Sequence, residues 1–374
     1  MKVILIRGRA IDPAVNKIAK SLSQNGHEVK LLVWDRQNTL KIKNNEGYEI
    51  NRFNFKASYD KLTSVFYYPI WWIYIFFFLM REKYDVIHAC DLDTLLPAII
   101  VKIIKKKKLC YTIYDFYANN LPDGQFSFMR KAVRSLVASV EKFGIEFTEV
   151  LFLVDESRYE QVKSAKINKV VYIYNSPPDY LDTKYKQNSS DRVEIVIFYA
   201  GAIHRSRGIE HMIKAIEYLN NVKLIIAGTG PHKDLLENLT QKTKDRIEPM
   251  GWIPYEEVIA NSLNADILFA FYDPQIPANR YASPNKLFEA MMCGKPIITN
   301  AETTATKIVE TENCGVVVPY GDVEAIKDTI LKLKNNADLR ERLGKNGRRA
   351  YEERYGWGIM EERLLKAYAN LIDN

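Results

Sequence analysis

Cysteine is scarce in this chain of 374 residues, and the four that occur stand singly at Cys90, Cys110, Cys293 and Cys314, with no C-x-x-C pair. This spacing argues against a disulfide framework and against a structural zinc site, and it favours a reducing cytosol as the compartment. A long apolar run is also missing from the start. Too few apolar residues precede Arg7 for the core of a signal peptide, so MKVILIR is predicted to be a first β-strand.

A strong excess of one charge is absent as well. Lys and Arg number 53 against 46 Asp and Glu, and a net charge of +7 is too mild for so long a chain to indicate nucleic acid as a partner. Hydrophobic residues make up 47% and charged residues 26%, which is typical of a globular protein and excludes a disordered one. The length favours two domains.

Short apolar runs alternate with amphipathic stretches along the chain, a pattern that predicts βαβ units and an α/β fold with parallel sheets. The bend Asn175–Asp179 and the polar stretch up to Asp191 interrupt this alternation and are predicted to form a linker. We therefore expect one domain over residues 1–176 and a second over 177–356. The helical spacing of residues 357–374 predicts a C-terminal helix that packs back on the first domain.

Three segments of the second half carry residues suited to a phosphorylated ligand. They are YAGAIHRSRG at 199–208, AGTGP at 227–231 and SPNKLFEAMMCGKP at 283–296. In the first, backbone N–H groups at a helix start and two arginines suit a diphosphate. The bland alternatives are a strand-to-helix turn with solvated arginines for the first segment and a tight turn for the second.

The third segment reads as the start of a helix. Ser283 is expected to cap it, with Pro284 in the first turn. Asn285 and Lys286 then offer N–H groups and a cation at the positive end of the helix. One turn further, the carboxylate of Glu289 could accept two ribose hydroxyls. The alternative is an ordinary helix start with an exposed glutamate.

In this order and spacing the segments resemble the C-terminal half of the GT-B glycosyltransferases, specifically the large retaining family 4 (glycosyl transferases group 1). GWIPYEEV and ADILFAFY match two further motifs of that half. The first half is also similar, in DPAVNKIAKSLSQNGHEVKLLVWDR, YDVIHACDLDTLLPA, YTIYDFYANN and VVYIYNSPPD. The resemblance implies two Rossmann-like domains with parallel sheets facing an interdomain cleft, and transfer of a sugar from a nucleotide diphosphate sugar of UDP or GDP type.

The resemblance also implies roles for particular residues. Arg207 corresponds to the basic residue on the donor diphosphate and Glu289 to the ribose-binding glutamate. The remaining donor-site positions are the glycines Gly201 and Gly228, the base-binding Trp252 and Ile253, the diphosphate-binding amides of Asn285, Lys286 and Leu287, and Ser283, which opens an S-P-x-K helix start.

The sequence departs from the family pattern at several positions. Tyr281 replaces the first glutamate of E-x7-E, which faces the donor sugar, and Ala202 replaces an arginine after the first glycine. Tyr117 replaces the histidine of a D-x-H segment, and Arg7-Gly8-Arg9 stands in place of an N-terminal double glycine. These changes affect the sugar contacts and the catalytic assignment more than the nucleotide site.

Breaking a glycosyl–diphosphate bond develops negative charge on the leaving phosphate. Arg207, Lys286 and helix-start N–H groups could stabilise that charge without a metal, so we expect neither a metal nor another cofactor. Retention of anomeric configuration is implied by the family alone. Asp91 and Asp115, at the ends of neighbouring strands in the first half, are the candidate catalytic residues on the acceptor side. For each, helix capping or another structural role is the alternative.

An aromatic segment, Phe66–Met80, is apolar on every side, yet with Pro69 inside it is too short to cross a bilayer. Such a helix is either buried in the first domain or lies in a membrane interface, where Tyr and Trp are favoured. The run Lys105–Lys108 could meet anionic headgroups. On the second interpretation the acceptor is lipid-linked or another envelope glycan, and the protein is cytoplasmic and peripheral on the inner face of the cell membrane.

Three other functions stay open. One is transfer to a soluble acceptor without membrane contact. Another is a non-catalytic nucleotide-sugar-binding or scaffold protein, which Tyr281 and Tyr117 suggest. The third is an NAD oxidoreductase. The sequence argues against it, because Lys233 stands where the third glycine of a dinucleotide-binding fingerprint is expected.

Overall fold

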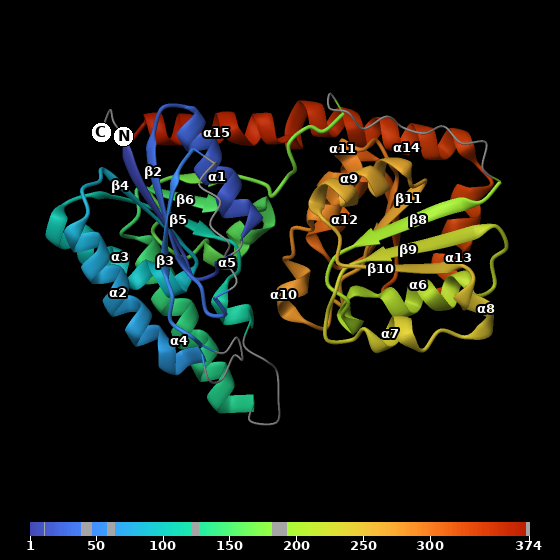
Figure 1. Ribbon diagram of the computed structural model, residues 1–374, viewed down its shortest axis with the longest axis horizontal. Helices are drawn as coiled ribbons and strands as arrows, with labels where there is room; N and C mark the ends of the chain where they lie inside the picture. Colours follow the sequence, from blue (N-terminus) through green and yellow to red (C-terminus); the bar gives the residue numbers. More distant parts are fainter. Residues whose placement is uncertain (11, 39–46, 58–63, 121–126, 182–192, 372–374) are drawn as a thin grey trace. The chain divides into compact units, whose positions relative to one another are not determined.

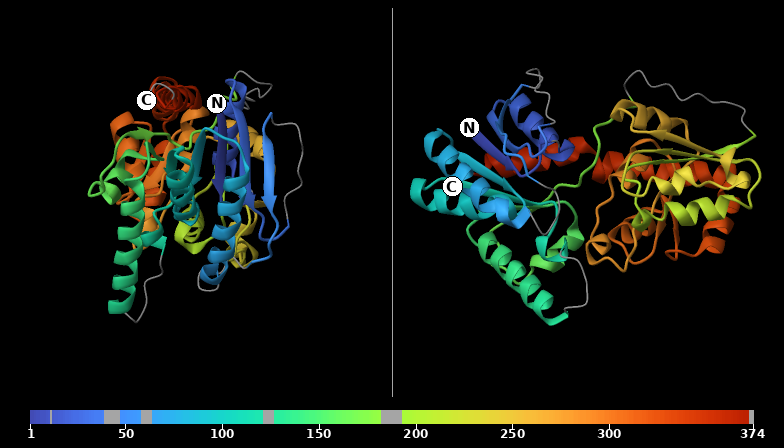
Figure 2. Two further views of the ribbon diagram at one scale, coloured as in Figure 1. Left: turned by 90° about the vertical axis from the view of Figure 1, so that its left-hand side faces the viewer. Right: turned by 60° about the horizontal axis from the view of Figure 1, so that its bottom comes forward.

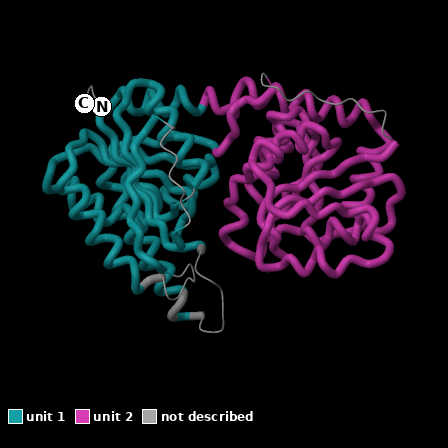
Figure 3. Tube along the Cα trace, viewed as in Figure 1, with its two compact units in different colours: residues 1–174, 360–374 teal, residues 175–359 magenta. Residues whose placement is uncertain are grey.

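The computed structural model describes residues 1–10, 12–38, 47–57, 64–120, 127–181 and 193–371. The chain forms two compact units, one made of Met1–Tyr174 with Met360–Asn374 and the other of Asn175–Ile359 (Figure 3). Each unit is built on its own parallel sheet (Figure 1). Of the stretch expected to be a linker, residues 182–191 lie outside the described residues.

The first unit contains a seven-stranded sheet in the order β3-β2-β1-β4-β5-β6-β7. Its strands are β1 (Lys2–Arg7), β2 (Glu28–Trp34), β3 (Glu49–Phe53), β4 (Val86–Cys90), β5 (Lys108–Ile113), β6 (Val150–Leu153) and β7 (Val170–Tyr172). Every strand pair is parallel, with Val3 opposite both Val29 and Val86. The central strand β4 is buried along its whole length, which requires helices on both faces of the sheet.

Helices cover both faces of this sheet (Figure 2). They are α1 (Pro13–Gln24), α2 (Tyr68–Arg81), α3 (Leu92–Lys105), α4 (Ser127–Ile145), α5 (Tyr159–Val162) and α15 (Trp357–Ala369), with 3-10 turns η1 (Ser64–Tyr67), η2 (Tyr117–Asn120) and η3 (Glu156–Arg158). Because side chains alternate along a strand, Ile87 joins the core under α2, α3 and α4, whereas His88 points to the other face. There the Nδ1 atom of His88 lies 2.6 Å from the hydroxyl of Tyr368 in α15.

The second unit contains a six-stranded parallel sheet in the order β10-β9-β8-β11-β12-β13. Its strands are β8 (Ile195–Ala200), β9 (Val222–Ala227), β10 (Ile247–Gly251), β11 (Ile267–Ala270), β12 (Ile297–Asn300) and β13 (Gly315–Val318). Its helices are α6 (Ile209–Ile216), α7 (Asp234–Glu237), α8 (Gln241–Lys244), α9 (Tyr255–Asn264), α10 (Pro277–Arg280), α11 (Asn285–Met292), α12 (Thr304–Glu312), α13 (Val323–Lys334) and α14 (Ala337–Ala350), with the short turns η4 (Arg205–Arg207) and η5 (Tyr351–Tyr355).

The strand order of each sheet reverses beside its first strand. In the first unit the chain moves from β1 outward to β3 and returns on the other side as β4, and in the second it moves from β8 to β10 and returns as β11. The crevice outside the carboxyl ends of the strands at such a reversal is the usual ligand site of an open α/β sheet. The two reversals are therefore the first places to look for a functional site.

The aromatic segment forms α2 together with η1, and it is neither wholly buried nor wholly exposed. Trp71, Ile75 and Leu79, spaced four residues apart, are fully buried, whereas Ile73 and Phe77 on the opposite side are exposed. One side of the helix therefore belongs to the core and the other side does not. None of the helices in the described ranges has both the length and the apolarity needed to cross a bilayer.

Candidate functional site

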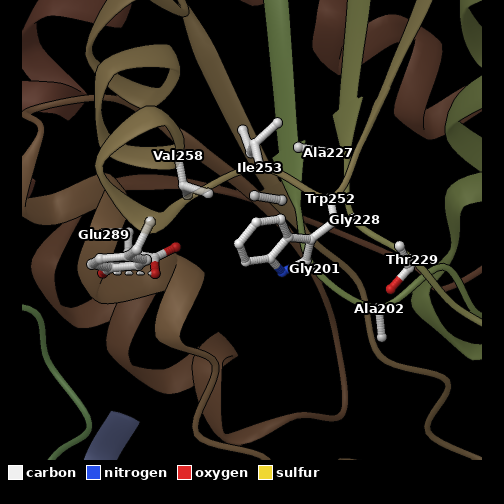
Figure 4. A pocket seen from close by; sticks show the side chains of 11 residues that line it. Gly201, Ala202, Ala227, Gly228, Thr229, Trp252, Ile253, Val258 and Glu289 are labelled. Carbon is white, nitrogen blue, oxygen red and sulfur yellow. Dashed lines mark hydrogen bonds between the residues drawn. The ribbon is translucent and has the colours of Figure 1, made fainter. Parts of the chain in front are cut away.

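A pocket of about 300 Å³ opens at the carboxyl ends of β8, β9 and β10 in the second unit. It is lined by Ala200, Gly201, Ala202, Ala227, Gly228, Thr229, Trp252, Ile253, Tyr255, Val258 and Glu289. In the close view Glu289 lies at one end, Thr229 and Ala202 lie at the other, and the Trp252 ring lies between them (Figure 4). The pocket thus brings together Gly201, Gly228, Trp252, Ile253 and Glu289, which the sequence analysis drew from four separate segments.

Two glycines let the loops after β8, β9 and β10 come together. The N–H of Gly201 donates to the carbonyl of Ala227 over 2.9 Å, and that of Gly228 donates to Gly251 over 2.6 Å. A Cβ atom on Gly228 would lie 1.8 Å from the carbonyl oxygen of Gly201, and the φ of Gly228 is +138°. Only glycine fits at Gly228, because any side chain would push the loops apart and open the floor of the pocket.

Glu289 reaches the pocket from the second turn of α11, and its side chain is almost fully buried. The hydroxyl of Tyr255, at the start of α9, donates a hydrogen bond to Oε1 of Glu289 over 3.1 Å. Burial and the neighbouring carboxylate both raise the pKa of Tyr255, so its hydroxyl keeps its proton and stays a donor. The carboxylate is thus held in one orientation at the wall of the pocket, where it can accept hydroxyl groups of a sugar ring.

The loop between β10 and α9 supplies an apolar surface to the pocket. The Trp252 side chain is 73% exposed although it lines the pocket, and Ile253 lies beside it. An exposed indole offers a flat face on which a planar heterocycle can stack, and the neighbouring backbone can bond to the ring edge. This arrangement suits the base of a nucleotide whose ribose is held by Glu289.

The start of α11 differs from the sequence-based expectation in two respects. The helix begins at Asn285, one residue later than predicted, because Pro284 has an extended conformation and is itself the cap. Ser283 therefore does not cap the helix, and its buried Oγ has no hydrogen-bond partner within the described residues. The amide of Leu287 donates to Pro284 over 3.0 Å, which leaves the amides of Asn285 and Lys286 as the ones suited to bind an anion.

Two cations lie close to this helix start. Lys286 is half-buried, with its Nζ 4.7 Å from the centre of the Tyr199 ring, and a Cβ on Gly201 would lie 2.7 Å from that nitrogen. Burial and the charge of Arg207 act to lower the pKa of Lys286, while Tyr199, Tyr272 and Glu289 act to raise it, and the net shift is upward. Lys286 therefore stays charged near a second cation, and an anionic ligand would relieve the repulsion between the two.

The guanidinium of Arg207, in η4, is held by two residues that the sequence analysis did not identify. It lies 4.1 Å from the centre of the Tyr272 ring, and its Nη1 donates to Oδ1 of Asn279 over 3.4 Å. Asn279 is nearly buried and is itself anchored, since its Nδ2 donates to the carbonyl of Asp273. No motif pointed to Asn279, because it acquires its role only through the fold. Tyr272 and Tyr255, by contrast, stand inside the quoted segments ADILFAFY and GWIPYEEV.

Tyr281 caps the C-terminus of α10 through its backbone N–H, which donates to Asn279. It does not belong to the lining of the pocket as described.

The reversal point of the first unit is filled by the chain's own side chains. Asp91 is buried, and its Oδ1 accepts the N–H groups of Tyr114 over 2.8 Å and of Asp115 over 3.1 Å, while its Oδ2 accepts from Arg7. Its φ of +66° marks a constrained position at the cap of α3. These contacts fit the structural role that the sequence analysis gave as the alternative to a catalytic role for Asp91. Asp115 differs, because its side chain is 42% exposed and its carboxylate lies 4.0 Å from Arg158.

Comparison with known proteins shows which family part of the chain resembles. A family model described as "Glycosyl transferases group 1" matches residues 182–350. The capsular polysaccharide biosynthesis glycosyltransferase CapM of Staphylococcus aureus is 30% identical over 206 residues, which cover 51% of this chain and 50% of CapM. The chain thus spans about half the length of that relative.

Solved structures resemble the chain over its whole length. A sucrose-phosphate synthase of Thermosynechococcus elongatus has a TM-score of 0.81 at 18% identity and covers 100% of both chains. HepE of Anabaena, solved in complex with UDP-glucose, has a TM-score of 0.72 at 14% identity and covers 99% of this chain and 100% of its own. At such low identity these likenesses show a shared fold and no more.

Proposed function

We propose that this chain, which belongs to the glycosyl transferases group 1 family and has the GT-B fold, is a glycosyltransferase that uses a nucleoside diphosphate sugar. The observation that carries the proposal is the pocket of the second unit. Its lining combines a fixed carboxylate with an exposed indole, and Lys286 lies beside Gly201 of that lining with Arg207 nearby. These are the groups that suit a ribose, a base and a diphosphate.

The proposed chemistry uses these groups. The bond between the anomeric carbon and the diphosphate oxygen breaks, the oxygen keeps the electron pair, and an acceptor hydroxyl forms the new bond and loses its proton. Arg207, Lys286 and the first amides of α11 stabilise the charge on the departing diphosphate. We propose that these groups suffice without a metal ion, and that transfer retains the anomeric configuration, as in the resembling family.

On the acceptor side we propose a lipid-linked sugar or another envelope glycan, reached at the inner surface of the cell membrane. The support comes from two sources. CapM is by its name an enzyme of capsular polysaccharide biosynthesis, and the helix α2 exposes apolar side chains that an aqueous surface does not favour. Asp115 is the candidate that could orient the acceptor hydroxyl, since its carboxylate is accessible.

The decisive experiment is a binding screen followed by turnover. Thermal shifts with UDP, GDP and their sugars should show stabilisation by at least one nucleotide, and Glu289→Ala should remove it. No shift with any nucleotide would refute the donor site. Incubation of the binding nucleotide sugar with membrane lipid extract should then release the nucleoside diphosphate, with EDTA present or absent. Binding without turnover on any acceptor would instead favour a non-catalytic nucleotide-sugar-binding protein.

A further inference from the structure

The outer side of α2 is as apolar as its buried side. While Trp71 and Ile75 pack in the core, Ile70, Ile73 and Phe77 on the opposite side are exposed, at spacings of three and four residues. A helix on the surface of a soluble protein normally presents polar residues there. The exposed side of α2 therefore has the composition of an interface.

The apolar surface continues over two neighbouring helices. α3 packs along α2, and α4 contacts α3; the three helices can be followed in Figures 1 and 2. On α3 the exposed residues include Ile100 and Ile103, and on α4 they include Leu136 and Phe143. We call the exposed apolar residues of α2, α3 and α4 the three-helix face. Contiguous apolar surface spread over three elements marks a binding surface, unlike isolated exposed side chains.

A groove of about 630 Å³ runs within this face. Four residues of α2, five of α3, Phe143 at the end of α4 and Phe147 just after it line the groove, and all of them are apolar. Trp72 forms part of the wall, and its ring is fixed because its indole N–H donates to the carbonyl of Asp93 over 2.9 Å. A groove of this size and lining suits a flexible hydrocarbon chain and offers no partner for a polar ligand.

Cations border the face at the C-terminal ends of its helices. Arg81 ends α2, Lys83 follows it, Lys106 follows α3, and all three are exposed. Lys105, which the sequence analysis counted among the headgroup-binding residues, has another role, since its Nζ donates to the carbonyls of Leu79, Met80 and Glu82 at the end of α2. The apolar groove thus has a positive border, which complements an amphiphile with an anionic head.

We propose that the three-helix face binds anionic lipid and that its groove takes up one hydrocarbon chain. The inference deepens the proposed function and rests on it only in identifying the lipid with a membrane or lipid-linked acceptor. The lipid would contact α3 and α4 as well as the aromatic segment. The groove would bind one hydrocarbon chain saturably, which simple partition of the protein into a bilayer would not require.

The test uses the full chain and a monomeric probe, 11-bromoundecanoate, whose bromine quenches tryptophan fluorescence on contact. We expect saturable quenching and a stoichiometry of one by calorimetry. Trp72→Phe should lose most of the quenching and keep the calorimetric binding. Ile100→Glu and Phe77→Glu, both at exposed positions in the groove lining, should weaken binding at least tenfold.

Matched controls keep this result separate from folding and from the donor site. Tyr218→Glu changes an exposed aromatic residue of the second unit and should leave probe binding unchanged. A thermal shift with UDP should be the same in all variants if they fold. Loss of the UDP shift in the wild type with intact probe binding would refute the proposed function and leave the lipid groove standing.

Further probes identify the kind of lipid from which the bound hydrocarbon chain comes. Farnesyl phosphate and dodecyl phosphate distinguish an isoprenoid from an acyl chain, and inorganic phosphate tests the head alone. Vesicles with phosphatidylglycerol should carry the protein in flotation, and pure phosphatidylcholine vesicles should carry much less. The proposal is overturned if the probe does not bind saturably, if Ile100→Glu and Phe77→Glu bind as the wild type does, or if the wild type is a dimer that Ile100→Glu dissociates.

Discussion

The hydroxyl of Tyr255 donates a hydrogen bond to Oε1 of Glu289, joining the first turn of α9 to the second turn of α11 across the wall of the pocket. Glu289 is almost fully buried, whereas Tyr255 is 40% exposed, so water competes poorly for the carboxylate. A carboxylate that has lost its rotational freedom before the ligand arrives has less entropy to lose on binding. Tyr255 is thus a positioning residue for Glu289.

Tyr255→Phe should weaken the binding of UDP about tenfold, because a hydrogen bond to a charged group contributes about 1.5–3 kcal/mol and its loss frees the carboxylate to rotate. Glu289→Gln should weaken binding further. Isothermal titration measures both affinities. The matched control is Tyr218→Phe, at an exposed position outside the pocket. Equal affinities for the wild type and Tyr255→Phe would show that the tyrosine does not position Glu289.

Gly228→Ala should abolish nucleotide binding and destabilise the second unit by about 2–3 kcal/mol, since the added Cβ would overlap the carbonyl of Gly201. For a unit of this size that corresponds to about 5–10 °C in Tm. Gly358→Ala is the control, because a Cβ there meets nothing within 4 Å. Circular dichroism melts compare the two variants. A Gly228→Ala protein that melts and binds UDP like the wild type would contradict the close approach of the loops.

Arg207→Ala should lower kcat about 10²–10³-fold with little change in Tm, as expected for the removal of one group that stabilises charge on the leaving diphosphate. The neighbouring Arg205 provides a close control. It is exposed and pairs with Glu210 and Asp234, so Arg205→Ala should leave kcat unchanged. Steady-state release of the nucleoside diphosphate measures both. Comparable kcat values for the two alanine variants would remove Arg207 from the mechanism.

Glu141 in α4 predicts a pH-dependent stability of the first unit. Burial raises its pKa from 4.5 to about 8, although hydrogen bonds from Tyr111 and Tyr117 act to lower it. Because the folded state holds this proton more tightly than the unfolded state, the stability from Glu141 is full below pH 4.5 and is lost as the pH rises through about 8. The whole change corresponds to about 5 kcal/mol.

Glu141→Gln keeps the neutral form at every pH, so its Tm relative to the wild type should rise steadily between pH 5 and pH 8.5. Thermal unfolding in a series of buffers measures the difference. Glu146→Gln, at an exposed position just after α4, should follow the wild type. A difference between Glu141→Gln and the wild type that is independent of pH would show that Glu141 is ionised in the folded protein throughout this range.

Local sequence pattern was sufficient for most of the strands and for much of the pocket of the second unit. The apolar run Lys108–Ile113 forms a strand, because a strand buried on both faces has a distinct composition. Gly201, Gly228 and Glu289 could be identified because each belongs to a motif whose spacing reflects a backbone requirement. The start of α11 was predicted one residue early, since Pro284 is compatible with both a cap and a first helical turn.

The helix α4 shows where such patterns fail. Its apolar residues form one stripe, in which Val137 and Val140 pack against the core whereas Leu136 and Phe143 are exposed, so the pattern does not tell which of them other elements cover. The same ambiguity affected α2, for which burial and interface were treated as alternatives. One side of α2 is buried and the opposite side is exposed, and only neighbouring elements determine which side is which.

The sequence by itself determined the α/β architecture, two sheets, and several residues that line the pocket of the second unit, because period, turn chemistry and motif spacing are properties of short stretches. The tertiary structure decided how those residues are used. In the fold Asp91 accepts hydrogen bonds from Arg7 and two backbone amides, Lys105 donates to carbonyls at the end of α2, and Tyr255 donates to Glu289. Hydrogen bonds between residues so far apart in sequence exist only once the sheets have formed.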